Sequence, residues 1–187
     1  MVAVLSTIGL LMGLYVAWRL FWPLRMPTWM KVVLSLLLVG VAVQLRIVAM
    51  FWGTMASPEI PKLAIATLAT GSTAVLLLAL LMLALDVSLL ASRLLRRPRA
   101  VAALRTRSLR PVAGLLALLV SGYGISQGMA VPQPRQIDVA IKDLPAAFDG
   151  YRVLQLTDIH ASRLLTGDWV RRVVDQSNAL TPDLIVI

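Results

Sequence analysis

The sequence predicts a multi-pass α-helical membrane bundle of four transmembrane helices, followed by a small water-soluble α/β segment. Two observations support this fold class. Of the 187 residues, 59% are hydrophobic, above the roughly 45–50% that is typical of soluble domains. This excess lies in four long apolar runs, whereas the chain beyond residue 131 mixes polar and apolar residues.

Each apolar run is long enough to cross a bilayer. The runs cover residues 2–22, 32–52, 63–85 and 111–131. At a rise of about 1.5 Å per residue, each spans the roughly 30 Å of hydrocarbon in a membrane. The first run lacks a basic leading segment and a clear cleavage site, so we expect a retained helix and not a signal peptide. Residues 1–131 therefore form the predicted transmembrane region.

Charge is divided unevenly between the two regions. Residues 1–131 hold 12 Lys and Arg against 2 Asp and Glu, whereas residues 132–187 hold 6 against 7. The membrane region therefore carries a net charge of +10 and the soluble segment −1, which together give the +9 of the chain. No basic patch remains on the soluble segment, which argues against a nucleic-acid partner.

The first and third loops between the runs are basic, and the second loop is almost neutral. The positive-inside rule therefore predicts that loops one and three face the cytoplasm. Both chain ends, and the soluble segment, are then expected on the outer (periplasmic or extracellular) side of the cytoplasmic membrane. The third-loop arginines are interpreted as topology determinants, with membrane lipids as incidental partners. The basic residues are Arg19, Arg25 and Lys31 in loop one, and Arg93, Arg96, Arg97, Arg99, Arg105, Arg107 and Arg110 in loop three.

Ionisable residues inside the runs lie near their ends. Arg46 is in the outer half of the second run and Asp86 is at the inner end of the third. The two lie at opposite predicted depths, so we do not expect them to pair. A transporter would place such groups near the midplane, so transport is disfavoured.

Small residues at helical spacing predict two sites of close helix packing. They are Gly9-x-x-x-Gly13 in the first run and Gly124-x-x-x-Gly128 in the fourth. Glycines four residues apart let two helix backbones approach closely.

Beyond a Pro-containing linker at residues 132–136, the pattern predicts strand, strand, helix, strand. Alternation of apolar and polar residues predicts a half-buried strand at Ile137–Ile141. The helix is expected to be capped by Asp168 and ended by Pro182. The wholly apolar end predicts a buried parallel strand, so the latter part is a βαβ unit. The expected later elements are a strand at 151–157, a helix at 169–180 and a strand at 184–187.

The stretch Thr157-Asp158-Ile159-His160 lies where the second predicted strand ends. Side chains two apart on an extended backbone point to the same side, so Asp158 and His160 can converge on one metal ion. A carboxylate with an imidazole suits Mn, Fe or Zn better than Ca or Mg. An isolated Asp-x-His also fits a turn-capping Asp beside a solvated His. His160 is the only histidine of the chain, so no second histidine completes the site.

Residues 150–160 (Gly-Tyr-Arg-Val-Leu-Gln-Leu-Thr-Asp-Ile-His), followed by Pro-Asp-Leu-Ile-Val-Ile at 182–187, resemble the start of the calcineurin-like metallophosphoesterase superfamily, in particular its membrane-associated bacterial branch. The resemblance covers residues 137–187, and Thr157 stands where the family often has Ser. It implies the N-terminal part of an α/β metallophosphoesterase β-sandwich, with two divalent metals held at strand ends. It also implies that Asp158 and His160 ligate the first metal.

The other ligands of that family are expected beyond residue 187, beginning with a Gly-Asp motif. The chain then holds at most one partial metal site and is predicted to be inactive alone. Gly167-Asp168 also spells Gly-Asp, but it follows Asp158 by only ten positions, which leaves no room for a helix and a strand. We therefore predict Asp168 to be a helix cap and not a ligand.

The resemblance implies a membrane-anchored hydrolase of phosphomonoesters, phosphodiesters or pyrophosphates. A membrane-tethered domain is well placed for a lipid-linked phosphate substrate. No acid, base or nucleophile is assigned by the sequence. The alternative hypothesis is non-enzymatic: the helices form an interaction or transport module, and the soluble segment is a degenerate appendage.

Overall fold

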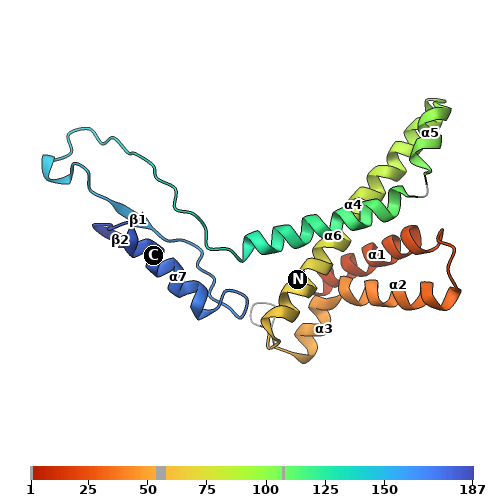
Figure 1. The fold of residues 1–187 in the computed structure, drawn as a ribbon, viewed down its shortest axis with the longest axis horizontal. Helices are drawn as coiled ribbons and strands as arrows, with labels where there is room; N and C mark the ends of the chain where they lie inside the picture. Colours follow the sequence, from red (N-terminus) through yellow and green to blue (C-terminus); the bar gives the residue numbers. More distant parts are fainter. Residues whose placement is uncertain (1, 54–57, 107) are drawn as a thin grey trace. The chain divides into compact units, whose positions relative to one another are not determined.

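The computed structural model describes residues 2–53, 58–106 and 108–187. The chain divides into two units, Met1–Gly128 (unit 1) and Met129–Ile187 (unit 2) (Figure 1). Two parts of the predicted loops, residues 54–57 and Arg107, lie outside the described residues.

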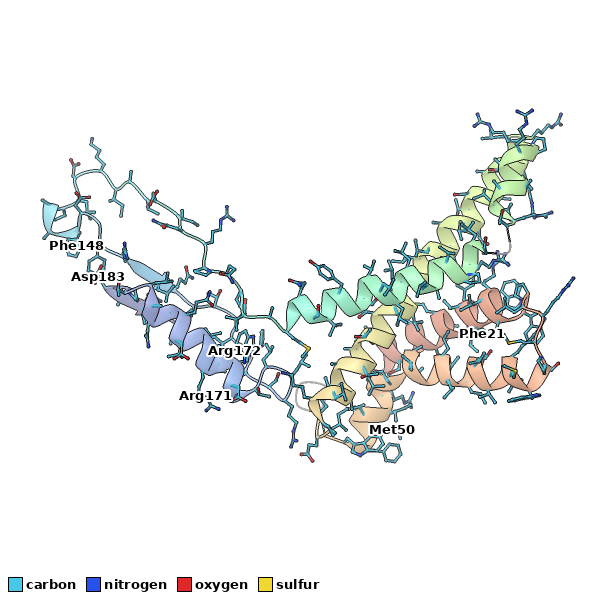
Figure 2. All side chains as sticks on the ribbon, viewed as in Figure 1. Phe21, Met50, Phe148, Arg171, Arg172 and Asp183 are labelled. Carbon is cyan, nitrogen blue, oxygen red and sulfur yellow. The ribbon has the colours of Figure 1, made fainter. Side chains whose placement is uncertain are left out.

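The described residues of unit 1 lie mainly in helices. Three of its described helices are long and apolar enough to cross a membrane, and apolar side chains project from their flanks (Figure 2). Outward-facing apolar side chains are what a helix needs where lipid, not water, surrounds it. The prediction of a helical membrane bundle is thus supported. The helices are α1 (Val2–Phe21), α2 (Thr28–Ala42), α3 (Gln44–Phe51), α4 (Lys62–Leu94), α5 (Pro98–Leu104) and α6 (Leu109–Gly128).

The second predicted span is not one straight helix. Its two halves, α2 and α3, meet at the non-helical residue Val43 with a bend of 66°. An apolar run indicates that a segment lies in the membrane, but it does not show whether the helix in that segment is broken. The sequence analysis therefore predicted a single helix. The polar residues Gln44 and Arg46 begin the second half. A fourth span exists if the bent pair crosses as one unit, and it stays a prediction.

The third predicted span is longer than expected. α4 continues from Leu85 to Leu94, giving 33 residues, or about 50 Å at the usual helical rise. The expected third loop then contains α5, which begins with Pro98. Proline is favoured at a first helical position because its missing N–H has no intrahelical partner there.

Helices α1, α4 and α6 meet in the core of unit 1. Val16 of α1, Leu78, Ala79 and Met82 of α4, and Ala117 of α6 form one buried cluster. In a membrane the hydrophobic effect does not drive helices together, so close van der Waals packing in such a cluster stabilises the bundle.

Only one of the two glycine motifs packs closely within the described residues. A Cβ atom at Gly9 would overlap the backbone oxygen of Ala42, and one at Gly13 would lie 3.0 Å from the Ala42 Cβ. The first motif therefore lets α1 approach α2, as predicted. Around Gly124 and Gly128 a Cβ would meet no described atom within 4 Å, so the second prediction was wrong.

Unit 2 contains a βαβ arrangement. Strand β1 (Val153–Gln155) pairs in parallel with β2 (Leu184–Val186), and α7 (Gly167–Ala179) connects them. A short 3-10 helix, η1 (Ala146–Phe148), precedes β1. The parallel pairing, the helix and its end before Pro182 agree with the sequence prediction.

Two predictions for unit 2 were wrong. Residues 137–141 form no strand, and the apolar side chains of Ile137, Val139 and Ile141 are exposed. A strand needs a hydrogen-bonding partner, and the two described strands of unit 2 pair with each other. Strand β2 is exposed rather than buried, because α7 and one short neighbour cannot cover both faces of it.

Candidate metal centre

Asp158 and His160 lie just beyond the carboxyl end of β1. The last hydrogen bond of the ladder runs from the Leu156 N–H to the Val186 carbonyl, at 2.8 Å. Because β1 and β2 are parallel, their carboxyl ends meet at one sheet edge, where α/β proteins usually bind ligands. Ile159 is half-buried, whereas its two neighbours are exposed. The inward Ile159 thus leaves Asp158 and His160 together on the solvent side.

The backbone reaches this arrangement by turning and not by extending. Asp158 has φ 54° and His160 has φ 40°, both in the left-handed region. Asp and His enter this region more often than most residues, at a cost of roughly 1–2 kcal/mol each. The prediction of an extended Asp-x-His was therefore wrong in conformation. The two side chains nevertheless converge, with His160 Nε2 3.7 Å from Asp158 Oδ1.

The spacing of these two atoms is slightly wider than shared coordination of a metal ion requires. Donors at about 2.0–2.2 Å from one metal lie roughly 2.8–3.6 Å from each other at octahedral or tetrahedral angles. The observed separation is close to that range, and both side chains are more than 80% exposed. Among the described residues, no group of three or more His, Asp or Glu side chains lies together. The pair thus provides two ligand atoms, and a metal site would need further ligands.

Asp183 of the Pro-Asp motif has a structural position. Its carboxylate accepts a hydrogen bond of 2.8 Å from the Arg152 N–H, and its own N–H donates to the Arg152 carbonyl at 2.9 Å. The Arg152 guanidinium also donates to the Leu180 carbonyl at 3.1 Å. These bonds set the register of β2 against β1, and hence the sheet edge on which Asp158 lies. The sequence marked Asp183 as part of the family pattern but gave no role for it.

Asp168 lies inside the first turn of α7 and not at its cap. The N-cap residue is Thr166, whose side chain makes no capping hydrogen bond, and Asp168 forms an ion pair with Arg171. The predicted cap position, Asp168, was therefore wrong by two residues, since the helix is capped at Thr166. A carboxylate in the first turn is still favourable, because it faces the positive end of the helix dipole.

A polar cluster in unit 1 was missed by the sequence analysis. Asp86 of α4 forms an ion pair with Arg19 of α1 and accepts a 2.8 Å hydrogen bond from the Tyr15 hydroxyl. The Arg19 Nε is buried and has no partner among the described residues. Arg19 and Asp86 lie at the same predicted depth in the membrane, and this feature of the sequence could have indicated the ion pair. Arg19 had been assigned to a loop, so the pairing was not considered.

The fold and the site together define a class: a helical membrane protein that carries a βαβ unit with an Asp–His pair at its sheet edge. Over 77 residues the chain is 29% identical to a zebrafish (Danio rerio) protein described as "Transmembrane protein with metallophosphoesterase domain". The match covers 39% of this chain and 18% of that relative. It supports similarity at the level of the superfamily at most. No protein-family model matches the chain, and no solved structure matches it significantly.

Proposed function

We propose that this chain is the membrane anchor and first βαβ unit of a metal-dependent phosphoesterase of the calcineurin-like superfamily, in its membrane-associated bacterial branch. The observation that supports the proposal is the approach of Asp158 and His160, 3.7 Å apart at the carboxyl edge of the sheet. The partial similarity to a transmembrane protein with a metallophosphoesterase domain points to the same class.

In this proposal Asp158 Oδ1 and His160 Nε2 hold a divalent ion, Mn, Fe or Zn by the chemistry of the donors. When bound, such an ion supplies Lewis-acid polarisation of a phosphoryl oxygen and makes a coordinated water more acidic. The chain itself contributes the orientation of both donors through the two left-handed residues. The remaining ligands of a two-metal centre are proposed to follow residue 187.

The substrate is proposed to be a phosphate ester, with lipid-linked phosphates as the favoured class. Tethering to a multi-span bundle holds the catalytic domain close to the bilayer, which raises its encounter rate with phosphates at the membrane surface. The basic residues in the loops that follow α1 and α4 support a cytoplasmic position for these two loops. Unit 2 is then proposed to lie on the outer side of the cytoplasmic membrane.

The test uses the longest natural protein that contains this chain, with the substitution Asp158→Asn. We expect bound metal, measured by elemental analysis, and hydrolysis of a chromogenic phosphodiester to fall together, by tenfold or more. An amide is neutral and a weaker ligand than a carboxylate, so both quantities depend on the same change.

The matched control is Asp175→Asn, which removes an exposed carboxylate from α7 and should alter neither quantity. If the Asp158→Asn protein kept its metal and its activity, Asp158 would be removed from the ligand set and the proposal would lose its main support. Vigorous hydrolysis by the 187-residue chain alone would contradict the expectation that two donors are not enough.

A further inference from the structure

We propose that the segment from the end of α4 through α5 binds the headgroups of anionic phospholipids in the membrane that the helices cross. This segment, residues 93–105, is here called the basic turn. The inference does not depend on hydrolase activity, because it concerns only unit 1 and no residue of the candidate metal centre.

The charge of the basic turn is uncompensated. No acidic residue occurs between Asp86 and Asp138. None of the arginines of the basic turn has an ion-pair partner among the described residues. Those arginines, all of them exposed, are Arg93, Arg96, Arg97, Arg99 and Arg105.

The basic turn lies at the depth of the lipid headgroups. The pair between Arg19 and Asp86 joins the end of α1 to α4, and Trp18 and Trp22 beside Arg19 are more than half exposed. Exposed tryptophans mark the boundary between hydrocarbon and headgroups. The part of α4 beyond Asp86 adds roughly 12 Å along its axis, which carries the chain from that boundary into the headgroup layer.

Apolar side chains accompany the arginines. Leu94 is 74% exposed and Leu95 is 65% exposed, immediately before Arg96 and Arg97. At an interface, leucines enter the acyl boundary while long basic side chains reach outward to phosphates. The same residues in contact with water would leave two large apolar side chains unprotected.

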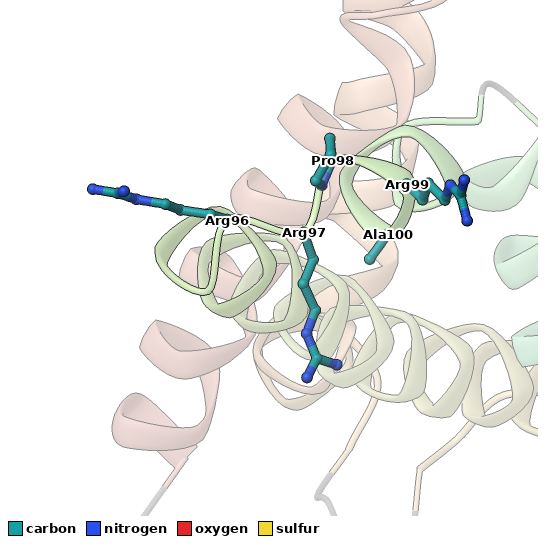
Figure 3. A pocket seen from close by; sticks show the side chains of 5 residues that line it. All are labelled: Arg96, Arg97, Pro98, Arg99 and Ala100. Carbon is teal, nitrogen blue, oxygen red and sulfur yellow. The ribbon is translucent and has the colours of Figure 1, made fainter.

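The guanidinium groups diverge and do not form one cradle. Figure 3 shows Arg96, Arg97 and Arg99 around a shallow hollow that Pro98 and Ala100 complete, with the three side chains pointing in different directions. A single soluble phosphate would therefore meet one guanidinium at a time. A bilayer offers many phosphates side by side, so separate arginines can each contact a different headgroup.

The test measures lipid selectivity with the full chain in phosphatidylcholine bilayers. Trace spin-labelled phosphatidylglycerol or phosphatidylcholine reports the lipid held at the protein surface. We expect phosphatidylglycerol to be preferred severalfold, and the preference to fall by half or more in the variant R96Q/R97Q/R99Q, which keeps Arg93 and Arg105. Raising the salt to 1 M should weaken the wild-type preference, since screening shortens the reach of exposed charges.

Two further variants keep the test decisive. R96K/R97K/R99K retains the charge and should retain the preference. R135Q/R163Q/R172Q removes three exposed charges from unit 2 and should leave the preference unchanged. An unaltered preference in R96Q/R97Q/R99Q, with helical circular dichroism preserved, would overturn the proposal and leave these arginines as topology determinants. The proposal would also be overturned if the wild-type protein showed no preference for phosphatidylglycerol over phosphatidylcholine.

Discussion

Units 1 and 2 are held together by different kinds of contact. In unit 1, α1 approaches α2 so closely at Gly9 that no side chain fits between them, and α1, α4 and α6 share a buried cluster. In unit 2, only Trp169 and Ser177 of the described residues are buried. Its order depends on a few hydrogen bonds to backbone atoms, such as those between Arg152 and Asp183.

This difference indicates where each unit is sensitive to substitution. A membrane bundle depends on shape and on the pairing of its few charges, because lipid offers no replacement partners for either. A small solvated unit loses less when one bond is broken, since water replaces the missing partner. The largest mutational effects are therefore expected in unit 1.

The greatest loss is predicted for Asp86→Ala. The substitution leaves the Arg19 charge without its counter-ion in a partly buried position, and it removes the acceptor of the Tyr15 hydroxyl. Breaking such a pair costs about 3 kcal/mol. Thermal unfolding in detergent micelles, followed by helical circular dichroism, should show a clearly lowered midpoint.

The double variant Arg19→Leu with Asp86→Leu is the control for this prediction. Replacing both partners by apolar residues leaves no unpaired charge, so most of the lost stability should return. If Asp86→Ala unfolded at the wild-type temperature, the ion pair would have no part in holding α1 against α4.

A second effect, of about 1–3 kcal/mol, is predicted for Gly9→Ala, because the new methyl group collides with the Ala42 backbone oxygen and forces α1 away from α2. The matched control is Gly124→Ala in α6, where a Cβ meets nothing within 4 Å. There alanine should stabilise the helix by about 0.5–1 kcal/mol. The same micelle measurement compares the two variants, and equal midpoints would contradict the close approach at Gly9.

The sequence predicted the helices of unit 1 well because a membrane helix satisfies its own backbone hydrogen bonds. Its apolar run is then enough to locate it, as α1 and α6 show. The bend at Val43 was not predicted, because the apolar run 32–52 resumes after Gln44 and Arg46, and these two residues do not by themselves mark a break in a helix. The sequence predicted that Arg19 and Asp86 lie at the same depth in the membrane. Predicting that they pair also requires knowing that α1 and α4 are neighbours.

Unit 2 was harder to predict because its elements depend on partners. Residues 137–141 have the alternation of a strand but no strand beside them among the described residues. At the candidate site, the sequence identified Asp158 and His160 and their convergence. It did not predict their left-handed backbone, since that conformation depends on how the chain leaves the sheet after Leu156. Whether they bind a metal stays a prediction.

The smallest effect is predicted for Trp169→Phe in unit 2. The indole N–H donates to the Ala130 carbonyl at 3.2 Å and ties the beginning of unit 2 to α7. Phenylalanine keeps most of the buried ring but loses the donor, while water can still reach the exposed Ala130. The expected cost is about 1 kcal/mol, so amide hydrogen exchange in α7 should quicken roughly fivefold. Exchange in α4 should not change.

The control for this last prediction is Trp29→Phe, which alters an exposed tryptophan of unit 1 and should leave exchange in α7 as it is. Unchanged exchange in Trp169→Phe would mean that the indole bond does not order α7. Equal quickening in α4 and α7 would instead mean that the two units unfold together, and the contrast between a shape-dependent bundle and a separately ordered βαβ unit would be wrong.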